Sequence, residues 1–409
     1  MKPVTRKSRP LIAEKWHLSQ YDAKDRKSRP RFVLITDCTL REGEQAPGVV
    51  MSPTEKLKLA RELDAAGFRE LEVGMPSISD EEAETVESIC RAGLEAHTVV
   101  LCRAIRSDIE LAVRCGARGV SLSLPVSQLQ LEHKLHMTVD QVIERVISLS
   151  NIAHGWGLTV TLSPSDTTRT DEQVLVRYLT EVSRHGHADR VRLVDTVGAA
   201  TPGAIAYLVR VMKGAADLPV EIHVHDDFGL ATANTFAGIL AGAEVASTTI
   251  NGVGERSGNA ATEEVVAGLE LLYGIDTGID MTRLLALSQM VEASTGFSVQ
   301  PHKAIVGRNA FAQEAGLVVG GFVNNPFTAI PYMPELVGQE SRIVLGKKSG
   351  IASVAIKLRE LGLSATDGQM DAILVKVKES AQAHKRPVGD TEFAAIAGAV
   401  VGDLREKGR

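Results

Sequence analysis

Phe32-Val33-Leu34-Ile35 begins the part of the chain whose pattern decides the fold. This apolar run is typical of a buried strand. Ser52-Pro53-Thr54-Glu55 then supplies a serine N-cap, a proline in the first turn and a glutamate that can close a capping box. Apolar residues repeat at helical spacing from Leu57 to Ala66, and Gly67 ends the pattern. The segment therefore predicts a strand followed by a helix.

The same unit recurs up to residue 275. Further strands are predicted near 71–73, 97–102, 118–124, 158–163, 190–195, 220–225 and 246–251. Further helices are predicted near 80–92, 107–115, 138–154, 171–185, 202–214, 231–242 and 260–273. Eight such units in about 245 residues predict a parallel sheet closed into a (β/α)₈ TIM barrel over residues 32–275. No Gly-x-Gly-x-x-Gly follows an early strand, which weakens the alternative of an open dinucleotide-binding sheet.

The regular alternation stops after residue 275. Residues 276–345 combine a helical stretch at 280–294 with Gly- and Pro-rich segments, so we expect a linker region there. Residues 346–409 predict a small helical C-terminal subdomain, with helices at 350–361, 367–384 and 391–405. The predicted fold class is therefore α/β, a TIM barrel followed by a linker and this helical subdomain.

The charge of the chain is unevenly distributed. Its 409 residues carry a net charge of −6 with a pI of about 6.0, which is no signature of a nucleic-acid-binding protein. Residues 1–31 hold ten Lys and Arg against three acidic residues, a local charge of +7 that leaves −13 for the remainder. We expect this basic N-terminal extension to be a solvated, weakly ordered tail. An arm that binds nucleic acid or an acidic partner is the alternative.

Cysteine usage and hydropathy indicate the compartment. The four cysteines, at positions 38, 90, 102 and 115, show no paired spacing for zinc or for a disulfide framework. Free thiols in a reducing cytosol explain them better. No apolar run approaches the roughly 18 residues of a membrane span, and the N-terminus lacks the apolar core of a secretory signal. We therefore expect a soluble, cytoplasmic protein with no membrane partner.

Two histidines lie in the predicted seventh strand, in Glu221-Ile222-His223-Val224-His225. Because a strand alternates its faces, His223 and His225 point the same way, one pleat apart. Neutral imidazole nitrogens at this spacing can both reach one divalent cation. The alternative is a pair of polar residues that only form hydrogen bonds to the backbone at a strand end.

Polar residues also follow the other predicted strands, at the carboxyl ends where TIM barrels carry their chemistry. They are Thr36–Gln45, Glu72, Arg103, Ser163–Asp166, Asp195-Thr196 and Asn251–Asn259. Buried charge without a partner is costly, so a ring of such groups favours a metal site over a purely structural role. Carboxylate, imidazole and amide ligands without a thiolate suit Mg²⁺, Mn²⁺, Zn²⁺ or Co²⁺. Such a metal can act as a Lewis acid on the carbonyl of a 2-oxo acid, with an arginine beside the developing alkoxide.

Five ordered motifs resemble the homocitrate synthase/2-isopropylmalate synthase family. They are Asp37–Gln45 (DCTLREGEQ), Leu71–Gly74, Asp195–Gly198, His223–Asp227 and Asn251–Asn259. Two further stretches, Ser123–Leu135 and Leu272–Asp280, are most similar to homocitrate synthases of the nitrogen-fixation type. The resemblance implies a metal-dependent barrel enzyme that condenses acetyl-CoA with a 2-oxo acid. It also implies a homodimer in which the linker reaches over the partner's barrel.

The resemblance assigns roles to individual residues. It implies metal ligands at Glu42, His223 and His225, with Asn259 as a weaker fourth. Asp37 could have been chosen as readily as Glu42 from the sequence alone.

The remaining roles concern catalysis and substrate binding. The resemblance implies that Arg41 lies beside the substrate keto group, that Thr196 holds the substrate carboxylate and that Glu72 is a supporting carboxylate. We add Arg103 and Ser163, at the ends of the third and fifth strands, as candidate substrate-binding residues.

The chain departs from the family at several positions. The family's linker motif has two histidines where this chain has Gln313 and Val318, and the second histidine is implicated in proton transfer at the acetyl group. Lys348 and Ser165 replace the usual histidine and glutamate of two other motifs. A valine cannot transfer a proton, and general acid–base help contributes about 10²–10⁴-fold to a rate. Either another group serves as the base, or the acceptor and the reaction have changed.

Three functions follow from these observations. The first is a condensation of acetyl-CoA with a 2-oxo acid that releases CoA, with 2-oxoglutarate as the default acceptor and oxaloacetate or an unusual 2-oxo acid as alternatives. The second is a carbon–carbon lyase or aldolase on the same metal site. Related acyl-CoA lyases carry a cysteine in the loop before the Asn ligand, and Gly252–Gly258 has none, which favours synthesis. The third is a paralogue that binds metal and 2-oxo acid without catalysis.

Overall fold

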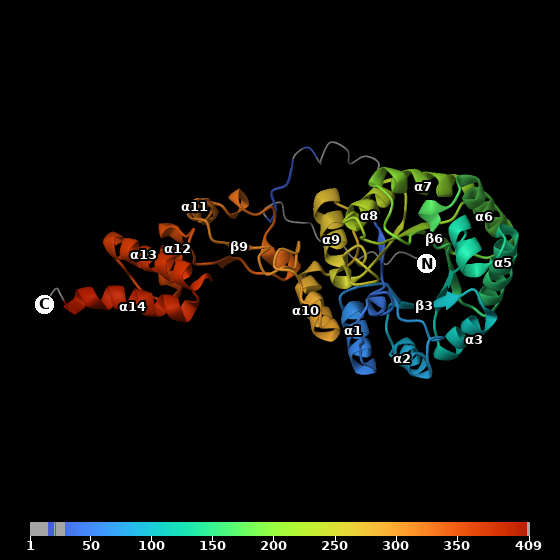
Figure 1. Ribbon diagram of the computed structural model, residues 1–409, viewed down its shortest axis with the longest axis horizontal. Helices are drawn as coiled ribbons and strands as arrows, with labels where there is room; N and C mark the ends of the chain where they lie inside the picture. The colour runs from blue at the N-terminus through green and yellow to red at the C-terminus, as the bar shows by residue number, and fades with distance from the viewer. Residues whose placement is uncertain (1–14, 20, 22–28, 407–409) are drawn as a thin grey trace. The chain divides into compact units, whose positions relative to one another are not determined.

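The computed structural model describes residues 15–19, 21 and 29–406, which divide into two compact units (Figure 1). Within the described residues, one unit lies between residues 22 and 299, and the other combines residues 15–19 and 21 with residues 300–406. The first unit contains a closed barrel of eight parallel strands, in which each strand pairs with the next and β8 pairs with β1. The predicted TIM barrel is confirmed.

The barrel elements alternate as predicted. The strands are β1 (Leu34–Asp37), β2 (Glu70–Glu72), β3 (His97–Arg103), β4 (Gly119–Ser123), β5 (Thr159–Ser163), β6 (Arg190–Asp195), β7 (Val220–Val224) and β8 (Val245–Thr248). The helices are α1 (Pro53–Ala65), α2 (Asp80–Cys90), α3 (Arg106–Cys115), α5 (Val139–Gly155), α6 (Glu172–His185), α7 (Pro202–Ala215), α8 (Ala231–Leu240) and α9 (Thr262–Ala267). The predicted capping box of α1 is present, because Ser52 and Glu55 each accept a hydrogen bond from the other's backbone amide.

Three details of this unit differ from the expected pattern. The helix after β8 changes from α9 into a π-helical turn over Gly268–Tyr273. A short helix α4 (Gln128–Gln130), followed by a π-helical turn over Leu131–Leu135, lies in the connection after β4. The unit also extends past residue 275 to residue 299, because α10 (Leu284–Thr295) packs against α1.

The strand register decides which side chains line the barrel interior. In a parallel sheet, residues in register share a face. The pairs Glu72–Val99, Arg192–Glu221 and His223–Ser247 are in register on neighbouring strands. The buried charged side chains of the inward set are Glu70, Glu72, Arg190, Arg192 and Glu221. The barrel interior is therefore a network of ion pairs rather than an apolar core.

Arg192 is central to this network. Its Nη2 lies 2.6 Å from Oε2 of Glu72, and its Nε donates a 2.9 Å hydrogen bond to Oε1 of Glu221. All three side chains are at most 1% exposed. Removal of one partner from a buried ion pair leaves an uncompensated charge in the interior.

Arg192→Leu is therefore expected to lower the free energy of unfolding by about 3–5 kcal/mol, measured from the midpoint of urea unfolding. Arg91→Leu is the matched control, because Arg91 forms an exposed ion pair with Glu87 on the surface of α2. Its midpoint should stay close to that of the wild type. Equal midpoints for the two variants would contradict a structural role for the interior network.

The second unit contains the predicted C-terminal helices. They are α12 (Ile351–Glu360), α13 (Asp367–His384) and α14 (Asp390–Glu406). Their apolar faces share a core that includes Val354, Ile373 and Phe393. Before them lie the two-stranded parallel sheet of β9 (Ala312–Gln313) and β10 (Arg342–Ile343), and helix α11 (Gly316–Asn324). No helix in the described part of the chain is both long and apolar enough to cross a membrane.

A short N-terminal segment belongs to this unit. Trp16 pairs with Tyr332 in an antiparallel bridge, the amide of His17 donates to the carbonyl of Pro331, and the amide of Met333 donates to the carbonyl of Lys15. Residues 15–19 thus differ from the expected solvated tail. The rest of the basic extension, at 1–14, 20 and 22–28, lies outside the described residues.

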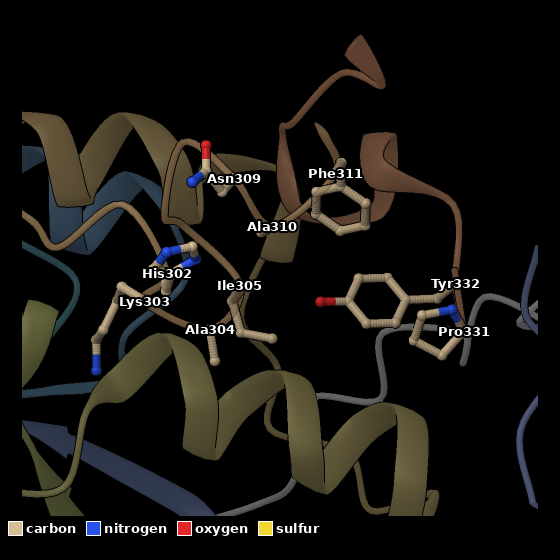
Figure 2. A pocket seen from close by; sticks show the side chains of 9 residues that line it. All are labelled: His302, Lys303, Ala304, Ile305, Asn309, Ala310, Phe311, Pro331 and Tyr332. Atoms are coloured by element: carbon tan, nitrogen blue, oxygen red, sulfur yellow. The ribbon is translucent and has the colours of Figure 1, made fainter. Parts of the chain in front are cut away.

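A small cavity of about 240 Å³ lies beside this pairing, and Figure 2 shows the side chains that line it. Phe311 and Tyr332 form its aromatic wall, with ring centroids 5.4 Å apart, and the Tyr332 hydroxyl points toward Ile305. Burial raises the pKa of Tyr332 to about 12, so its hydroxyl is protonated at neutral pH.

Candidate active site

Glu42, His223 and His225 come together at the carboxyl ends of the barrel strands. Glu42 follows β1, His223 lies in β7, and His225 comes directly after β7. Each of the three residues offers one potential ligand atom, and these three atoms all lie within 4.8 Å of one another. All three residues are buried. These three residues can therefore hold one divalent cation.

Unsatisfied polar atoms at this position fit a cation. Among the described residues, buried Oε1 of Glu42, Nδ1 of His225 and Oδ1 of Asn259 have no hydrogen-bond partner. Oε1 of Glu42 lies 3.8 Å from Nε2 of His225. Buried oxygen and nitrogen atoms without partners are costly, and a bound metal ion would satisfy them. The unpartnered atoms are a carboxylate oxygen, an imidazole nitrogen and an amide oxygen, which are donor types that a divalent cation accepts.

Both imidazoles are in the form that binds metals. Burial and the neighbouring His225 hold the pKa of His223 well below its usual range. Burial also lowers the pKa of His225, although the carboxylate of Glu42 opposes the shift. Both rings are therefore neutral at neutral pH, as a metal ligand must be. Because Nδ1 of His223 lies 2.9 Å from Oγ of Ser247, Nε2 of His223 is the nitrogen available to a cation.

Arg41 is fixed beside the cluster by three side chains. Its Nε donates to Glu72, and its Nη1 contacts Glu42 and donates a 2.8 Å hydrogen bond to Oε1 of Gln45. Burial alone would raise the pKa of Glu72, but the guanidinium groups of Arg192 and Arg41 lower it to about 2. Glu72 is therefore ionised and orients Arg41 toward the carboxylate of Glu42.

Asn259 reaches the cluster from the loop after β8. It pairs with His225 in an antiparallel bridge, and its Nδ2 donates to the carbonyl of Val253 at 3.3 Å. Gly254 lies so close that a Cβ there would collide with Nδ2 of Asn259. Gly258 has a φ of +89°, and a Cβ there would collide with the carbonyl of Gly252. The glycines of this loop thus allow Asn259 to lie next to Glu42.

The predicted substrate-binding residues lie at the same end of the barrel but are held by different partners. Oγ1 of Thr196 accepts a 2.7 Å hydrogen bond from the amide of Asp166, and Thr196 is only partly buried. Ser163 is buried at the end of β5, in register with Ser123 of β4. Arg103, in register with the same Ser123, forms a two-pronged ion pair with Asp108, and its side chain is 54% exposed. The structure thus brings Arg41 and Glu72 to the cluster, whereas the guanidinium of Arg103 pairs outside it.

Asp37 faces away from the interior, because it alternates with the inward Thr36. Its carboxylate accepts hydrogen bonds from the amide and hydroxyl of Thr39, and burial raises its pKa to about 7. The orientation of Asp37 therefore excludes it from the cluster around Glu42. The sequence alone could not choose between these two carboxylates.

Several residues at the site were given no individual role in the sequence analysis. Arg192 and Glu221 connect to Arg41 through Glu72, and Gln45 contacts Arg41 directly. Ser247 lies against His223. The alternation of polar residues along the predicted strands, together with a correct register, would have indicated Arg192, Glu221 and Ser247.

The linker positions that depart from the family lie in the unit of residues 300–409. Gln313 is in β9, and Val318 is in α11 with 39% of its surface exposed. Lys348 follows β10, and its amide donates a 3.0 Å hydrogen bond to Glu314. Gln313 and Val318 have no acidic or basic group with an ordinary pKa near neutrality.

Comparisons with known proteins agree with this fold. The model of the HMGL-like family matches residues 33–291, and that of the homocitrate synthase post-HMGL domain-like family matches residues 305–385. A hydroxymethylglutaryl-CoA lyase structure from Pseudomonas aeruginosa superposes with a TM-score of 0.60 at 24% identity, over 66% of this chain and 96% of that chain. At that identity the likeness concerns the fold alone.

Two curated relatives are similar over almost their whole length. Homocitrate synthase AksA of Methanothermobacter thermautotrophicus is 39% identical over 92% of this chain and 95% of its own length. 2-Isopropylmalate synthase 2 of Caldanaerobacter subterraneus subsp. tengcongensis is 40% identical over 90% of this chain and 95% of its own length. The two names give different products at nearly the same identity to this chain, so this level of identity does not settle the acceptor.

Proposed function

The chain belongs to the HMGL-like family, and on that premise we propose that it condenses acetyl-CoA with a 2-oxo acid and releases CoA. It is an enzyme of the acyltransferase type represented by the named synthases among its relatives. The observation that carries the proposed reaction is the buried cluster of Glu42, His223 and His225 beside Arg41.

The residues of this cluster have complementary roles in the proposed reaction. A divalent cation (Mg²⁺, Mn²⁺, Zn²⁺ or Co²⁺) held by Glu42, His223 and His225, with Asn259 as a weaker ligand, would polarise the keto group of the acceptor. Arg41, oriented by Glu72, donates to the oxygen that gains negative charge in the transition state.

The proposed reaction balances with water as the only further reactant. The methyl carbon of acetyl-CoA loses a proton and bonds to the keto carbon, and the keto oxygen takes up a proton. Water then cleaves the thioester, which yields a carboxylate and the thiol of CoA.

The charge of the site suits an anionic acceptor. The connected network contains four carboxylates and three guanidinium groups, a net charge of −1: Glu42, Glu70, Glu72 and Glu221 against Arg41, Arg190 and Arg192. A divalent cation changes the net charge to +1, which favours a bound carboxylate. Thr196 and Ser163 are the candidate neutral donors to that carboxylate.

We take 2-oxoglutarate as the first acceptor to test, and oxaloacetate or an unusual 2-oxo acid as the others. The second carboxylate of 2-oxoglutarate needs a cationic partner, and Arg103 is the inward-register arginine at the end of β3. Its guanidinium is half exposed and therefore accessible to a substrate carboxylate. The buried carboxylate of Asp108 would keep its hydrogen bonds from the Ser77 hydroxyl and the Arg103 amide.

Arg103→Leu is therefore expected to lower kcat/KM for 2-oxoglutarate by roughly 10–100-fold, the loss of one charge-assisted hydrogen bond. Its effect on pyruvate, which has no second carboxylate, should be less than about threefold. Arg106→Leu is the control, because Arg106 forms an exposed pair with Glu110. An equal loss for both acceptors would contradict contact between Arg103 and the second carboxylate.

A thiol-release assay tests the reaction itself. The purified chain is incubated with acetyl-CoA, Mg²⁺ or Mn²⁺ and a panel of 2-oxo acids, and free CoA thiol is measured with a chromogenic disulfide. We expect thiol release that depends on both the acceptor and the metal. No release with any acceptor would rule out the synthase, and formation of acetyl-CoA or a 2-oxo acid from a hydroxyacyl-CoA instead would identify a lyase.

Assembly and location form part of the same proposal. A homodimer with linker exchange would cover the apolar residues that α11 exposes, where Leu317 is 96% and Val323 is 51% exposed. Light scattering coupled to size-exclusion chromatography measures the molar mass of the protein in solution, which distinguishes a monomer from this homodimer. A cytoplasmic location agrees with the four free, buried cysteines.

A further inference from the structure

Ser247 lies between a candidate metal ligand and a buried thiol. Its Oγ is 2.9 Å from Nδ1 of His223 and 3.0 Å from Sγ of Cys38. Ser247 and Cys38 are at most 1% exposed, and His223 is 4% exposed. Ser247 is in β8, in register with His223 of β7, and Cys38 comes directly after β1. The three groups thus form a chain of contacts across adjacent strands, with no solvent between them.

Metal binding through Nε2 of His223 requires one particular arrangement of hydrogens among these groups. A neutral imidazole has one nitrogen that carries hydrogen and one that carries a free lone pair, and a metal ion needs the lone pair. If Nδ1 of His223 donates to Oγ of Ser247, the lone pair is on Nε2. The hydroxyl of Ser247 can then donate its own hydrogen to Sγ of Cys38, a weak acceptor.

His225 provides the contrast within the same cluster. Its Nδ1 is buried and has no hydrogen-bond partner among the described residues. The sequence places both histidines on one face of one strand, but only His223 has a side chain that fixes its ring. Of the two imidazoles, His223 is therefore the one whose orientation is set by a neighbouring strand before any metal binds.

We propose that Ser247 is a positioning residue that fixes the tautomer and ring orientation of His223, and that Cys38 in turn holds the Ser247 hydroxyl. Because the metal site itself belongs to the proposed function, this role rests on that function. Loss of such an outer partner of a metal-binding histidine typically weakens metal affinity 10–100-fold.

The first test measures Mn²⁺ affinity of the purified, metal-free full-length protein by electron paramagnetic resonance titration. We expect Ser247→Ala to raise the Kd for Mn²⁺ roughly 10–100-fold, and Ser247→Thr, which keeps the hydroxyl, to restore most of the affinity. Ser121→Ala is the matched control, because Ser121 is a buried, inward serine of β4 whose Oγ has no partner among the described residues. Wild-type affinity in Ser247→Ala, or equal losses in Ser247→Ala and Ser121→Ala, would overturn the proposed role.

The second test needs neither metal nor turnover. Long-range ¹H–¹⁵N correlation spectra of protein labelled at histidine report which ring nitrogen carries the hydrogen, and the His223 signals are assigned by their loss in His223→Gln. We expect a single Nδ1–H tautomer of His223 in the wild type and a mixture in Ser247→Ala. The same tautomer ratio in both proteins would overturn the role of Ser247. A wild type with this tautomer but no Mn²⁺ binding would instead contradict the proposed metal site.

Discussion

His223→Ala is expected to lose bound metal and turnover together. His223 supplies one of the three clustered ligand groups, and its ring is held by Ser247. Removal of the imidazole leaves Glu42 and His225, with Asn259 as the weaker ligand, to hold the cation. We expect the Kd for Mn²⁺ to rise more than about 100-fold. This exceeds the roughly 10–100-fold loss of affinity that follows removal of a residue that only supports a metal ligand. The rate of thiol release at a fixed Mn²⁺ concentration should fall at least as much as the fraction of protein that holds Mn²⁺, because every active site needs the cation.

The matched control is another strand histidine at the opposite end of the barrel. His97 begins β3, and its Nε2 lies 2.7 Å from Oγ1 of Thr159. His97→Ala should keep the Mn²⁺ affinity of the wild type. Circular dichroism confirms that both variants are folded. Turnover retained in His223→Ala would mean that the metal site lies elsewhere.

Arg41→Lys is expected to separate metal binding from catalysis. Lysine keeps the positive charge but cannot reproduce the contacts that the guanidinium makes with Glu72, Glu42 and Gln45 at once. Loss of one oriented donor to a developing oxyanion costs about 10²–10³-fold in kcat. We expect a decrease of that size, while the Kd for Mn²⁺ changes by less than about threefold because all three ligand groups remain.

Arg118→Lys is the control for this substitution. Arg118 lies just before β4, at the amino end of the barrel, and its guanidinium donates to the carbonyls of Leu94 and Ala96. Its kcat should remain close to that of the wild type. If Arg41→Lys lost metal as completely as His223→Ala, Arg41 would act on the ligands rather than on the substrate.

The regular alternation of strands and helices was sufficient to predict the barrel, because each strand–helix pair has its own apolar strand and its own helix pattern. Helix α11 was missed for a physical reason. Gly316 and its two later glycines lower the helix propensity of this segment. Gly316 and Gly350 also approach backbone to backbone, so that a Cβ on either would meet the other's Cα within 2.8 Å. Gly316, which lowers the helix propensity, is thus required by the packing of α11, whereas a Cβ at Gly320 would meet nothing within 4 Å.

The candidate site was predictable only in part. Glu42, His223 and His225 do lie together, as the resemblance implied. The interior ion pairs were not foreseen, because Arg192 and Glu221 become neighbours only through the register of β6 and β7. A one-residue shift of register would turn each to the outer face, and no local pattern fixes it. The ion pair of Arg103 with Asp108 depends in the same way on the position of α3 relative to β3.

The pairing of Trp16 with Tyr332 has a consequence for the order of events during translation. The whole barrel unit, residues 22–299, is synthesised between these two partners. Residues 15–19 therefore leave the ribosome long before Pro331 and Met333 exist, and the smaller unit is completed only after the barrel has had time to fold. Expression of residues 300–409 alone would leave the amide of Met333 and the carbonyl of Pro331 without these partners.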